Sequence, residues 1–271
     1  MYKVIACDLD GTLLKDDKSI SPETIEELKR LSEQGVILLP STGRTHREIP
    51  QLLKELPFIR YALCCNGGSV YDYQDNCYIY EDAIPHELAL KVLAFGKTLP
   101  VHESVVVNGE RLAEGYDNGE VCDYIKEKAV KGILFNFTGT PDLSKTFGER
   151  KQNAQKFLFY LNPDADKEEV INRLRNEFPE LAISSSGPLF IEINVKGVDK
   201  GKALRNFCQM LKIPIEESLA FGDAENDITM LEAAGKAVVM ENGTAETKKH
   251  ADLICASNND DGVRKTLEAL F

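Results

Sequence analysis

Ten residues near the N-terminus organise the chain, Val4-Ile5-Ala6-Cys7-Asp8-Leu9-Asp10-Gly11-Thr12-Leu13. The apolar run that begins them predicts a buried parallel strand that leads into a turn. Because residues i and i+2 of a strand face the same side, the carboxylates of Asp8 and Asp10 can converge beyond the sheet edge. Two such charges ~4 Å apart repel by roughly 4 kcal/mol at an effective dielectric of about 20, which favours a cation between them. A polar exit from strand to loop explains these residues equally well. The rest of the chain has to distinguish this exit from a cation-binding site.

Composition excludes some classes of protein. The 271 residues can form one or two domains, and the net charge of −12 argues against a nucleic-acid binder. A local cationic pocket can still hold a small anionic ligand. No basic segment followed by an apolar core marks a signal peptide, and no apolar run has the ~20 residues that a membrane helix needs.

The seven cysteines are odd in number and lack CxxC spacing. Cys7 and the pair Cys64-Cys65 lie in apolar runs, where a free thiol packs as a small hydrophobic group. This usage predicts a reduced, cytoplasmic protein and disfavours a catalytic cysteine. His46 follows Arg44 closely and could lie near a site, although a surface position is expected for it.

The next segments predict a βαβ unit. Ser21-Pro22-Glu23 is a typical helix start, and Gly35 ends that helix. Val36-Ile37-Leu38-Leu39-Pro40 then predicts a second buried strand, parallel to the first. Its exit, Ser41-Thr42-Gly43-Arg44, is expected to lead into a helix that runs to about Lys54. The Thr42 hydroxyl and the N–H groups of such a helix start suit a phosphate at the same sheet edge as Asp8.

A different pattern begins near Ala83. Before it, Asn66 and Gly67 form a turn that could border the same site. From residue 83 to 187 the alternation of helices and strands becomes irregular, which predicts a separate α+β domain inserted into the first. Its helices are predicted at Pro85–Lys97, Asn118–Ala129 and Lys167–Phe178. Its strands are predicted at Val105–Val107, Lys156–Leu161 and Ala182–Ser185.

The first domain is expected to resume at residue 188, with a strand over Phe190–Val195. Lys200 then lies in the first turn of a helix, where the helix dipole disfavours a cation. Functional sites carry such conflicts, and a solvated surface lysine is the alternative. The strand Leu219–Phe221 ends in Gly222-Asp223-Ala224-Glu225-Asn226-Asp227. A strand over Ala237–Met240, a helix from Thr244, a strand at Leu253-Ile254 and a helix from Asp260 complete the chain.

Four segments together resemble the motifs of the haloacid dehalogenase superfamily. They are Asp8-Leu9-Asp10-Gly11-Thr12-Leu13, Ser41-Thr42-Gly43-Arg44, Gly197-Val198-Asp199-Lys200-Gly201 and Gly222-Asp223-Ala224-Glu225-Asn226-Asp227. Their order and spacing are similar to the Cof-type branch, whose members are mostly magnesium-dependent phosphatases of sugar phosphates and related compounds. The resemblance covers essentially the whole chain. It implies an α/β fold, with a Rossmann-like parallel-sheet core at residues 1–82 and 188–271 and an α+β cap domain at residues 83–187.

The resemblance also implies roles for individual residues. Asp8 is the expected nucleophile, which forms an aspartyl-phosphate, and Asp10 the expected general acid and base. Mg²⁺ would be held by the Asp8 carboxylate, the backbone carbonyl of Asp10 and Asp223. Asp227 would lie in the next layer of residues around the metal, without binding it directly. The phosphoryl oxygens are expected to be bound by Leu9, Thr42, Gly43, Lys200 and Asn226. The cap would close over the site and contact the substrate.

The expected function is hydrolysis of a small phosphorylated metabolite, with no nucleic-acid or membrane partner, by a monomer or homodimer. Hexose phosphates are the first candidates for the substrate, and pyridoxal phosphate and flavin-pathway phosphates are the next. A phosphomutase of the same fold would return the phosphoryl group to a second hydroxyl and is told apart by its product. A non-catalytic sugar-phosphate-binding protein is the other alternative, and the intact acidic set argues against it.

Overall fold

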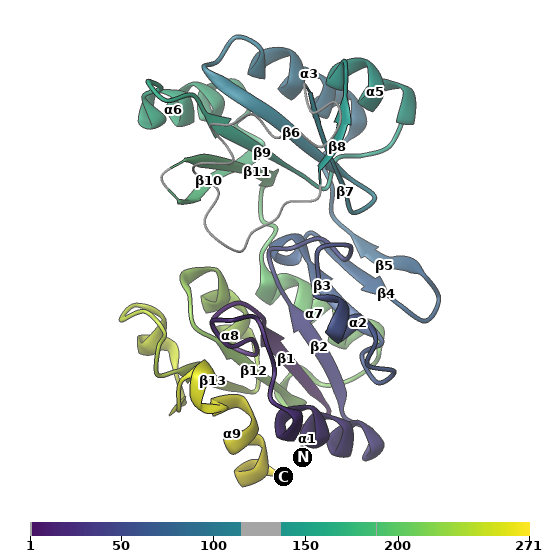
Figure 1. Cartoon of the computed structure of the whole chain (residues 1–271), viewed down its shortest axis with the longest axis vertical. Helices are drawn as coiled ribbons and strands as arrows, with labels where there is room; N and C mark the ends of the chain where they lie inside the picture. Colours follow the sequence, from purple (N-terminus) through teal and green to yellow (C-terminus); the bar gives the residue numbers. More distant parts are fainter. Residues whose placement is uncertain (1, 115–136, 188) are drawn as a thin grey trace. The chain divides into compact units, whose positions relative to one another are not determined.

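The computed structural model describes residues 2–114, 137–187 and 189–271 (Figure 1). The chain divides into two compact units, of which unit 1 comprises Met1–Glu81 and Asp199–Phe271, and unit 2 comprises Asp82–Val198. The predicted helix at Asn118–Ala129 lies outside the described residues.

Unit 1 is built on a sheet of eight strands in the order β14-β13-β12-β1-β2-β3-β4-β5. Neighbouring strands from β14 to β3 pair in parallel, and β4 and β5 extend the sheet antiparallel. The strands are β1 (Val4–Asp8), β2 (Ile37–Ser41), β3 (Tyr61–Cys64), β4 (Ser69–Asp72), β5 (Cys77–Glu81), β12 (Ser218–Gly222), β13 (Lys236–Met240) and β14 (Leu253–Cys255). The prediction of an α/β fold with a parallel, Rossmann-like core is confirmed.

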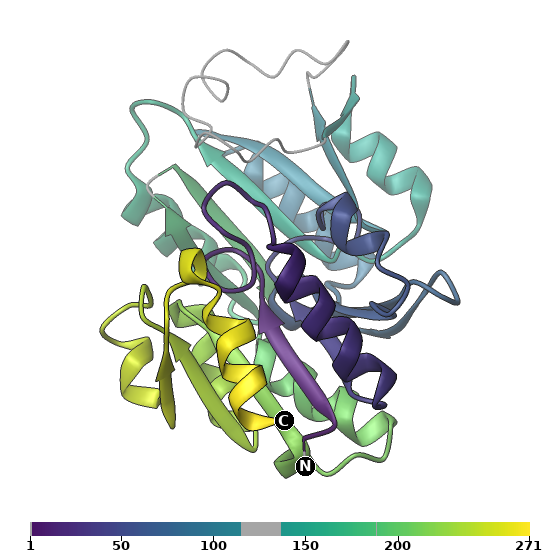
Figure 2. The ribbon, with the colours of Figure 1, turned by 60° about the horizontal axis from the view of Figure 1, so that its bottom comes forward.

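Both faces of the central strands of this sheet are buried, as their apolar sequences predict. Along β1, Ile5 and Cys7 join one hydrophobic cluster, while Val4 and Ala6 join another on the opposite face. The first cluster is covered by α1 (Pro22–Glu33) and α9 (Gly262–Leu270), which lie side by side in front of β1 in Figure 2. The second is covered by α7 (Lys200–Met210) and α8 (Ile228–Ala233).

Two predicted helices of unit 1 are wrong in extent. After Arg44 the chain forms a turn in which the N–H of Thr45 donates to the Glu48 carboxylate and the N–H of Glu48 donates to the Thr45 hydroxyl. Pro50 has no N–H to continue a helix, so the short helix α2 covers Gln51–Lys54 alone. The helix predicted from Thr244 is reduced to a 3₁₀ turn at Thr247–His250. The helix start at Ser21 is confirmed, because its hydroxyl accepts from the N–H of Thr24.

Unit 2 has its own sheet, in the order β10-β11-β9-β6-β7-β8. Its strands are β6 (Val101–Val107), β7 (Glu110–Glu114), β8 (Phe137–Thr140), β9 (Lys156–Leu161), β10 (Leu181–Gly187) and β11 (Phe190–Val195). Within its described residues the helices are α3 (His86–Gly96), α5 (Leu143–Arg150) and α6 (Lys167–Glu177), whose apolar residues pack with the sheet in one hydrophobic cluster.

The expectation that the first domain resumes at Phe190–Val195 is wrong. This strand, β11, pairs antiparallel with β9 and β10, so it belongs to the sheet of unit 2. The physical reason lies in its alternating sequence. Ile191 and Ile193 are buried in the cluster of unit 2, while Glu192 between them is only half-buried. Such alternation is typical of an antiparallel strand with one covered face, whereas the core strands of unit 1 are apolar on both faces.

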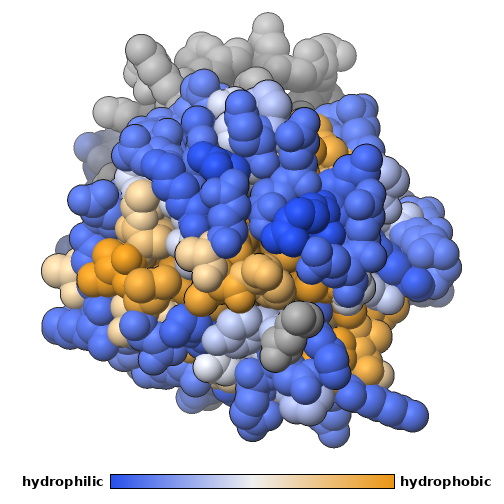
Figure 3. Space-filling view, turned by 90° about the horizontal axis from the view of Figure 1, so that it is seen from below, coloured by the Kyte–Doolittle hydropathy of each residue, from blue (hydrophilic) through white to orange (hydrophobic). Residues whose placement is uncertain are grey.

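Hydrophilic side chains cover most of the face shown in Figure 3, and hydrophobic ones gather in a band across it. Among the described residues, the large hydrophobic side chains that stand exposed are Met210, Leu253 and Ile254. In the described part of the chain, no helix combines the length and the apolar character needed to cross a membrane.

Candidate active site

Three strands of unit 1 end side by side, and their carboxyl ends supply the polar residues of the site. The register pairs Asp8 at the end of β1 with Ser41 at the end of β2, and Cys7 with Phe221 of β12. Thr42 and Asp223 each follow directly after a strand that flanks β1. Ligands of open α/β sheets bind at this kind of edge. The expectation that these segments meet is confirmed.

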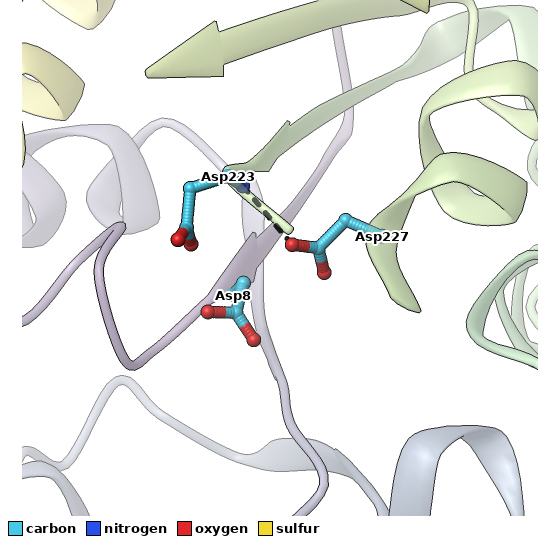
Figure 4. A group of neighbouring side chains, drawn as sticks. All are labelled: Asp8, Asp223 and Asp227. Carbon is cyan, nitrogen blue, oxygen red and sulfur yellow. Dashed lines mark hydrogen bonds between the residues drawn. The ribbon is translucent and has the colours of Figure 1, made fainter. Parts of the chain in front are cut away.

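Three carboxylates form an acidic cluster at this edge (Figure 4). One oxygen each from Asp8, Asp223 and Asp227 lies within 4.8 Å of the others. Figure 4 shows the three side chains grouped beyond the ends of β1 and β12, with the bond from the backbone of Asp223 to Asp227 dashed. The Asp227 carboxylate is completely buried and accepts from the backbone N–H groups of Asp223 (3.0 Å) and Ala224 (3.1 Å). These bonds close the loop after β12 and turn Asp227 toward Asp8.

Lys200 is the counterion of this cluster. Its side chain is fully buried, and its Nζ lies 2.6 Å from an oxygen of Asp8 and 2.6 Å from an oxygen of Asp227. The lysine is the first residue of α7, whose N-cap, Asp199, accepts from the N–H of Lys202. The two carboxylates offset the unfavourable position of a cation at a helix N-terminus. The alternative of a solvated surface lysine is therefore wrong.

The cluster holds more negative than positive charge, and its pKa values reflect this. Burial raises the pKa of Asp8 to about 8 against the opposing effect of Lys200, with a further increase from Asp227. Burial also raises the pKa of Asp223 to about 6, although the Thr12 hydroxyl stabilises its charged form. Burial acts to lower the pKa of Lys200, but Asp227 and Asp8 outweigh it and raise that pKa. Three carboxylates around one ammonium group form an oxygen donor set that suits a hard divalent cation.

The neighbouring glycines allow this close approach. Gly11 has φ +93°, and a Cβ added there would lie 2.5 Å from a carboxylate oxygen of Asp223. A Cβ on Gly222 would meet the Cβ of Asp227 at the same distance, 2.5 Å. Thr12, the next residue after Gly11, donates from its hydroxyl to Asp223 at 2.7 Å. The first motif therefore holds a carboxylate that lies 211 residues away along the chain.

Asp10 lies apart from the acidic cluster and is paired with two cations. Arg44 forms two bonds to its carboxylate, from Nε (2.8 Å) and Nη2 (2.7 Å), and the Nζ of Lys18 lies 2.8 Å from Oδ1. Burial acts to raise the pKa of Asp10, but the bonds from Arg44 and Lys18 outweigh it and hold that pKa below its usual range. The helix that was predicted to follow Arg44 begins only at Gln51, so Arg44 lies in a turn, where it pairs with Asp10.

The loop after β2 brings Thr42 and Gly43 to the site without a helix start. Thr42 is buried, and its hydroxyl accepts from the N–H of Arg44 at 3.2 Å. Asn66 packs beside Gly43, where an added Cβ would lie 3.0 Å from the Asn66 Oδ1. The same Oδ1 accepts from the side chain of Asn226 at 3.1 Å. The turn that contains Asn66 therefore links the second and fourth motifs.

Some predicted site residues do not contact the acidic cluster with their side chains. The Leu9 side chain is buried in the core, so only its backbone can face the site. Asn226 is exposed and contacts Asn66 rather than the acidic cluster. His46 is buried, and its ring stacks on Tyr71, so the expectation of a surface histidine is wrong. The contacts of Thr12, Lys18 and Arg44 with the site's carboxylates were not predicted, since no spacing rule points to them.

Comparisons with known proteins agree with this geometry. Residues 5–267 match a family model described as haloacid dehalogenase-like hydrolase. A 5-amino-6-(5-phospho-D-ribitylamino)uracil phosphatase of Bacillus subtilis is 30% identical, with 99% of this chain and 97% of that protein covered. A pyridoxal phosphate phosphatase of Escherichia coli is 29% identical, with 96% of each chain covered. A crystal structure from Thermotoga maritima is 31% identical with a TM-score of 0.87, and the match covers 100% of this chain and 98% of that one.

Proposed function

The chain belongs to the haloacid dehalogenase-like hydrolase family and is a phosphoric monoester hydrolase, and from this premise we propose that it hydrolyses small phosphorylated metabolites with Mg²⁺, through an aspartyl-phosphate on Asp8. The observation that carries the proposal is the position of Asp8, a buried carboxylate 2.6 Å from the Lys200 ammonium group and in one cluster with Asp223 and Asp227. A nucleophilic carboxylate and a cation that binds phosphoryl oxygens need this proximity.

In the proposed first step, Asp8 is the nucleophile. One of its carboxylate oxygens attacks phosphorus in line, a P–O bond to Asp8 forms, and the P–O bond to the alcohol breaks. Lys200 offsets the negative charge that the phosphoryl oxygens bring to the site. Asp8, Asp223 and the backbone carbonyl of Asp10 are the proposed ligands of Mg²⁺, with Asp227 orienting Asp223 and Lys200. The metal, when bound, would neutralise the carboxylates and the phosphate dianion.

Asp10 is the proposed acid and base. In the first step it donates a proton to the leaving alkoxide oxygen. In the second it takes a proton from the water that attacks phosphorus, while the P–O bond to Asp8 breaks and inorganic phosphate is released. The bonds from Arg44 and Lys18 favour the ionised, base form of Asp10. For the acid step the carboxyl group therefore has to leave these partners for the leaving oxygen. Thr42, Gly43, Lys200, Asn226 and the backbone of Leu9 are the proposed binders of the phosphoryl oxygens.

The substrate is proposed as a class. A sugar phosphate comes first, as the sequence resemblance implies, and the related phosphatases of a flavin-pathway intermediate and of pyridoxal phosphate extend the class. The role of unit 2 as a cap over the site stays a prediction, and so does the monomeric or homodimeric state. The six cysteines within the described residues are free thiols, which supports the proposal of a cytoplasmic location.

The test of this proposal is the Asp8→Asn variant. The two side chains are nearly isosteric, so we expect a folded protein that releases no phosphate from any member of a panel of phosphorylated metabolites. Wild-type protein should release phosphate from at least one of them, stop when EDTA is added and recover with excess Mg²⁺. Free phosphate as product excludes the phosphomutase alternative, and any turnover excludes the binding protein. Substantial activity in the Asp8→Asn variant would remove Asp8 from the role of nucleophile.

A further inference from the structure

Asn242 joins two distant segments of unit 1 through its side-chain amide. It lies in the turn that follows β13, and its Nδ2 donates to the backbone carbonyl of Gly11 at 2.7 Å. Its Oδ1 accepts from the backbone N–H of Asn258 at 3.0 Å. One amide therefore connects the loop after β1 with the segment before α9.

The same loop is held further along by two more asparagines. The buried side chain of Asn258 donates to the carbonyl of Leu14 and to a carboxylate oxygen of Asp16, at 3.0 Å in both cases. Asn259 donates to the other oxygen of Asp16 at 2.9 Å and accepts from the N–H of Asp16 at 3.1 Å. The contact of Asn242 is distinct because it lies closest to the residues of the candidate site.

The Gly11 carbonyl stands between two residues of that site. Asp10 precedes Gly11, and Thr12 follows it with a hydroxyl 2.7 Å from Asp223. The turn that contains Asn242 also reaches Asp223 directly, since the N–H of Thr244 donates to the Asp223 carbonyl at 2.9 Å. This turn therefore contacts both the loop that carries Asp10 and the loop that carries Asp223.

We propose that Asn242 is a positioning residue for the phosphatase reaction, which fixes the Gly11 peptide and through it the direction of Asp10 and Thr12. The inference rests on the proposed function. Gly11 has φ +93° and no side chain, so many backbone conformations are open to it, and the bond to Asn242 selects one of them. Small displacements of reacting groups lower rates strongly. The hydrogen bonds of the Asn242 side chain go to Gly11 and Asn258 and not to Lys200 or Thr42, so binding of the phosphoryl group is expected to stay intact.

The test compares three variants of the full chain. Asn242→Ala removes both bonds, and Asn242→Asp keeps the acceptor for Asn258 but places a carboxylate oxygen against the Gly11 carbonyl. We expect kcat to fall at least about 10-fold in both, in the range typical of residues that orient reacting groups, with KM changed by less than about 3-fold. Asn259→Ala is the matched control, because it loosens the same loop at Asp16 and should leave kcat unchanged.

The inference is wrong if Asn242→Ala keeps the wild-type kcat, or if Asn259→Ala lowers kcat equally. Hydrogen exchange supplies a readout that needs no turnover. Asn242→Ala should speed exchange of the Leu13 and Leu14 amides, which donate to the carbonyls of Asp8 and Leu9, and Asn259→Ala should change them less. If wild-type protein hydrolyses no phosphomonoester, the proposed function fails while the exchange data still support or contradict the placement of Asn242.

Discussion

At the scale of single residues, Lys200 is the cation that balances the buried carboxylates of the site. Its side chain is fully buried and forms ion pairs with Asp8 and Asp227. Replacing it by methionine keeps a side chain of similar length and leaves two buried carboxylates without their cation. Removing one partner of a buried ion pair costs about 3 kcal/mol or more. We expect Lys200→Met to lose that stability in urea unfolding and to lose turnover as well.

The control for this variant is Lys29→Met on α1, where the lysine is largely exposed and paired with Glu33. Exposed pairs contribute about 0–1 kcal/mol, so stability and turnover should both stay close to wild type. Mg²⁺ should restore part of the stability lost in Lys200→Met, since it supplies positive charge to the same carboxylates. Equal stabilities of Lys200→Met and wild type would contradict the buried ion pairs.

The carboxylates of the cluster also predict how stability depends on pH. The pKa values of Asp8 and Asp223 are raised to about 8 and about 6, so the folded protein binds these protons more tightly than the unfolded chain does. Their contribution to stability is present below the unfolded pKa of about 4 and is lost as pH rises through the folded pKa values. In EDTA, the Tm of Asp223→Asn should therefore fall less than that of wild type between about pH 5 and about pH 8.5.

Metal should reverse this trend. Mg²⁺ binds deprotonated carboxylates, so it should raise Tm more at the alkaline end of that range than at the acidic end. Thermal unfolding of wild type and of Asp223→Asn, in EDTA and in Mg²⁺, measures this effect. It gives the Tm increase from Mg²⁺ for each protein at each end of the pH range. A Tm increase from Mg²⁺ that is the same at both ends of the range would contradict the raised pKa values.

Sequence alone identified the residues that carry charge at the site but not all of their partners. Asp8, Asp223 and Lys200 follow from motifs whose residue types and order are informative. The bond from Thr12 to Asp223 spans 211 residues, and the bonds from Arg44 to Asp10 span 34. Such contacts depend on side-chain direction in the folded chain, which no local pattern encodes.

At the scale of elements, the turn at Cys65–Gly67 positions α7 and therefore Lys200. Gly67 has φ +102°, and a Cβ added there would lie 2.2 Å from the carbonyl oxygen of Asp199, the N-cap of α7. Gly67→Ala has to push the turn or the helix start away. Overpacking of this kind costs about 1–3 kcal/mol beyond the strain of a positive φ. We expect that loss of stability and a fall in kcat, because the helix start carries Lys200.

Gly35 provides the matched control for Gly67. It has a similar positive φ, +85°, but an added Cβ would meet no atom within 4 Å. Gly35→Ala therefore includes the backbone strain without the clash and should keep the wild-type kcat. Urea unfolding and steady-state kinetics of the two variants separate the two effects. The same kcat in Gly67→Ala as in Gly35→Ala would show that the turn does not position Lys200.

The elements that sequence predicted wrongly share a physical cause. Residues 45–54 read as a helix, but the reciprocal bonds of Thr45 and Glu48 and the missing N–H of Pro50 stop it until Gln51. Strand β11 was assigned to the core because it lies where the chain was expected to return to the first domain. Its alternating burial matches an antiparallel sheet instead. Strands β1, β2, β12 and β13 of unit 1, which are mostly apolar and buried, gave the clearest signal and were predicted correctly.

At the scale of the whole molecule, the two units have separate hydrophobic cores. The clusters on the two faces of the first sheet contain residues of unit 1, and the third cluster contains residues of unit 2. The acidic cluster, Lys200 and the loops that hold them all belong to unit 1. A metal bound there is therefore expected to stabilise one unit directly and the other not at all.

Hydrogen exchange with mass spectrometry measures this difference peptide by peptide. At a Mg²⁺ concentration about a hundred times its Kd, binding adds about 2.7 kcal/mol to the unfolding free energy of the unit that holds the site. Amides of β1, β12 and α7 should then exchange more slowly, while those of β6, β9 and α6 keep their rates. Asp223→Asn supplies the control, because it removes a carboxylate of the cluster and should abolish the change. Equal slowing in both units would mean that they unfold as one cooperative body, and slowing in unit 2 alone would move the metal away from Asp8.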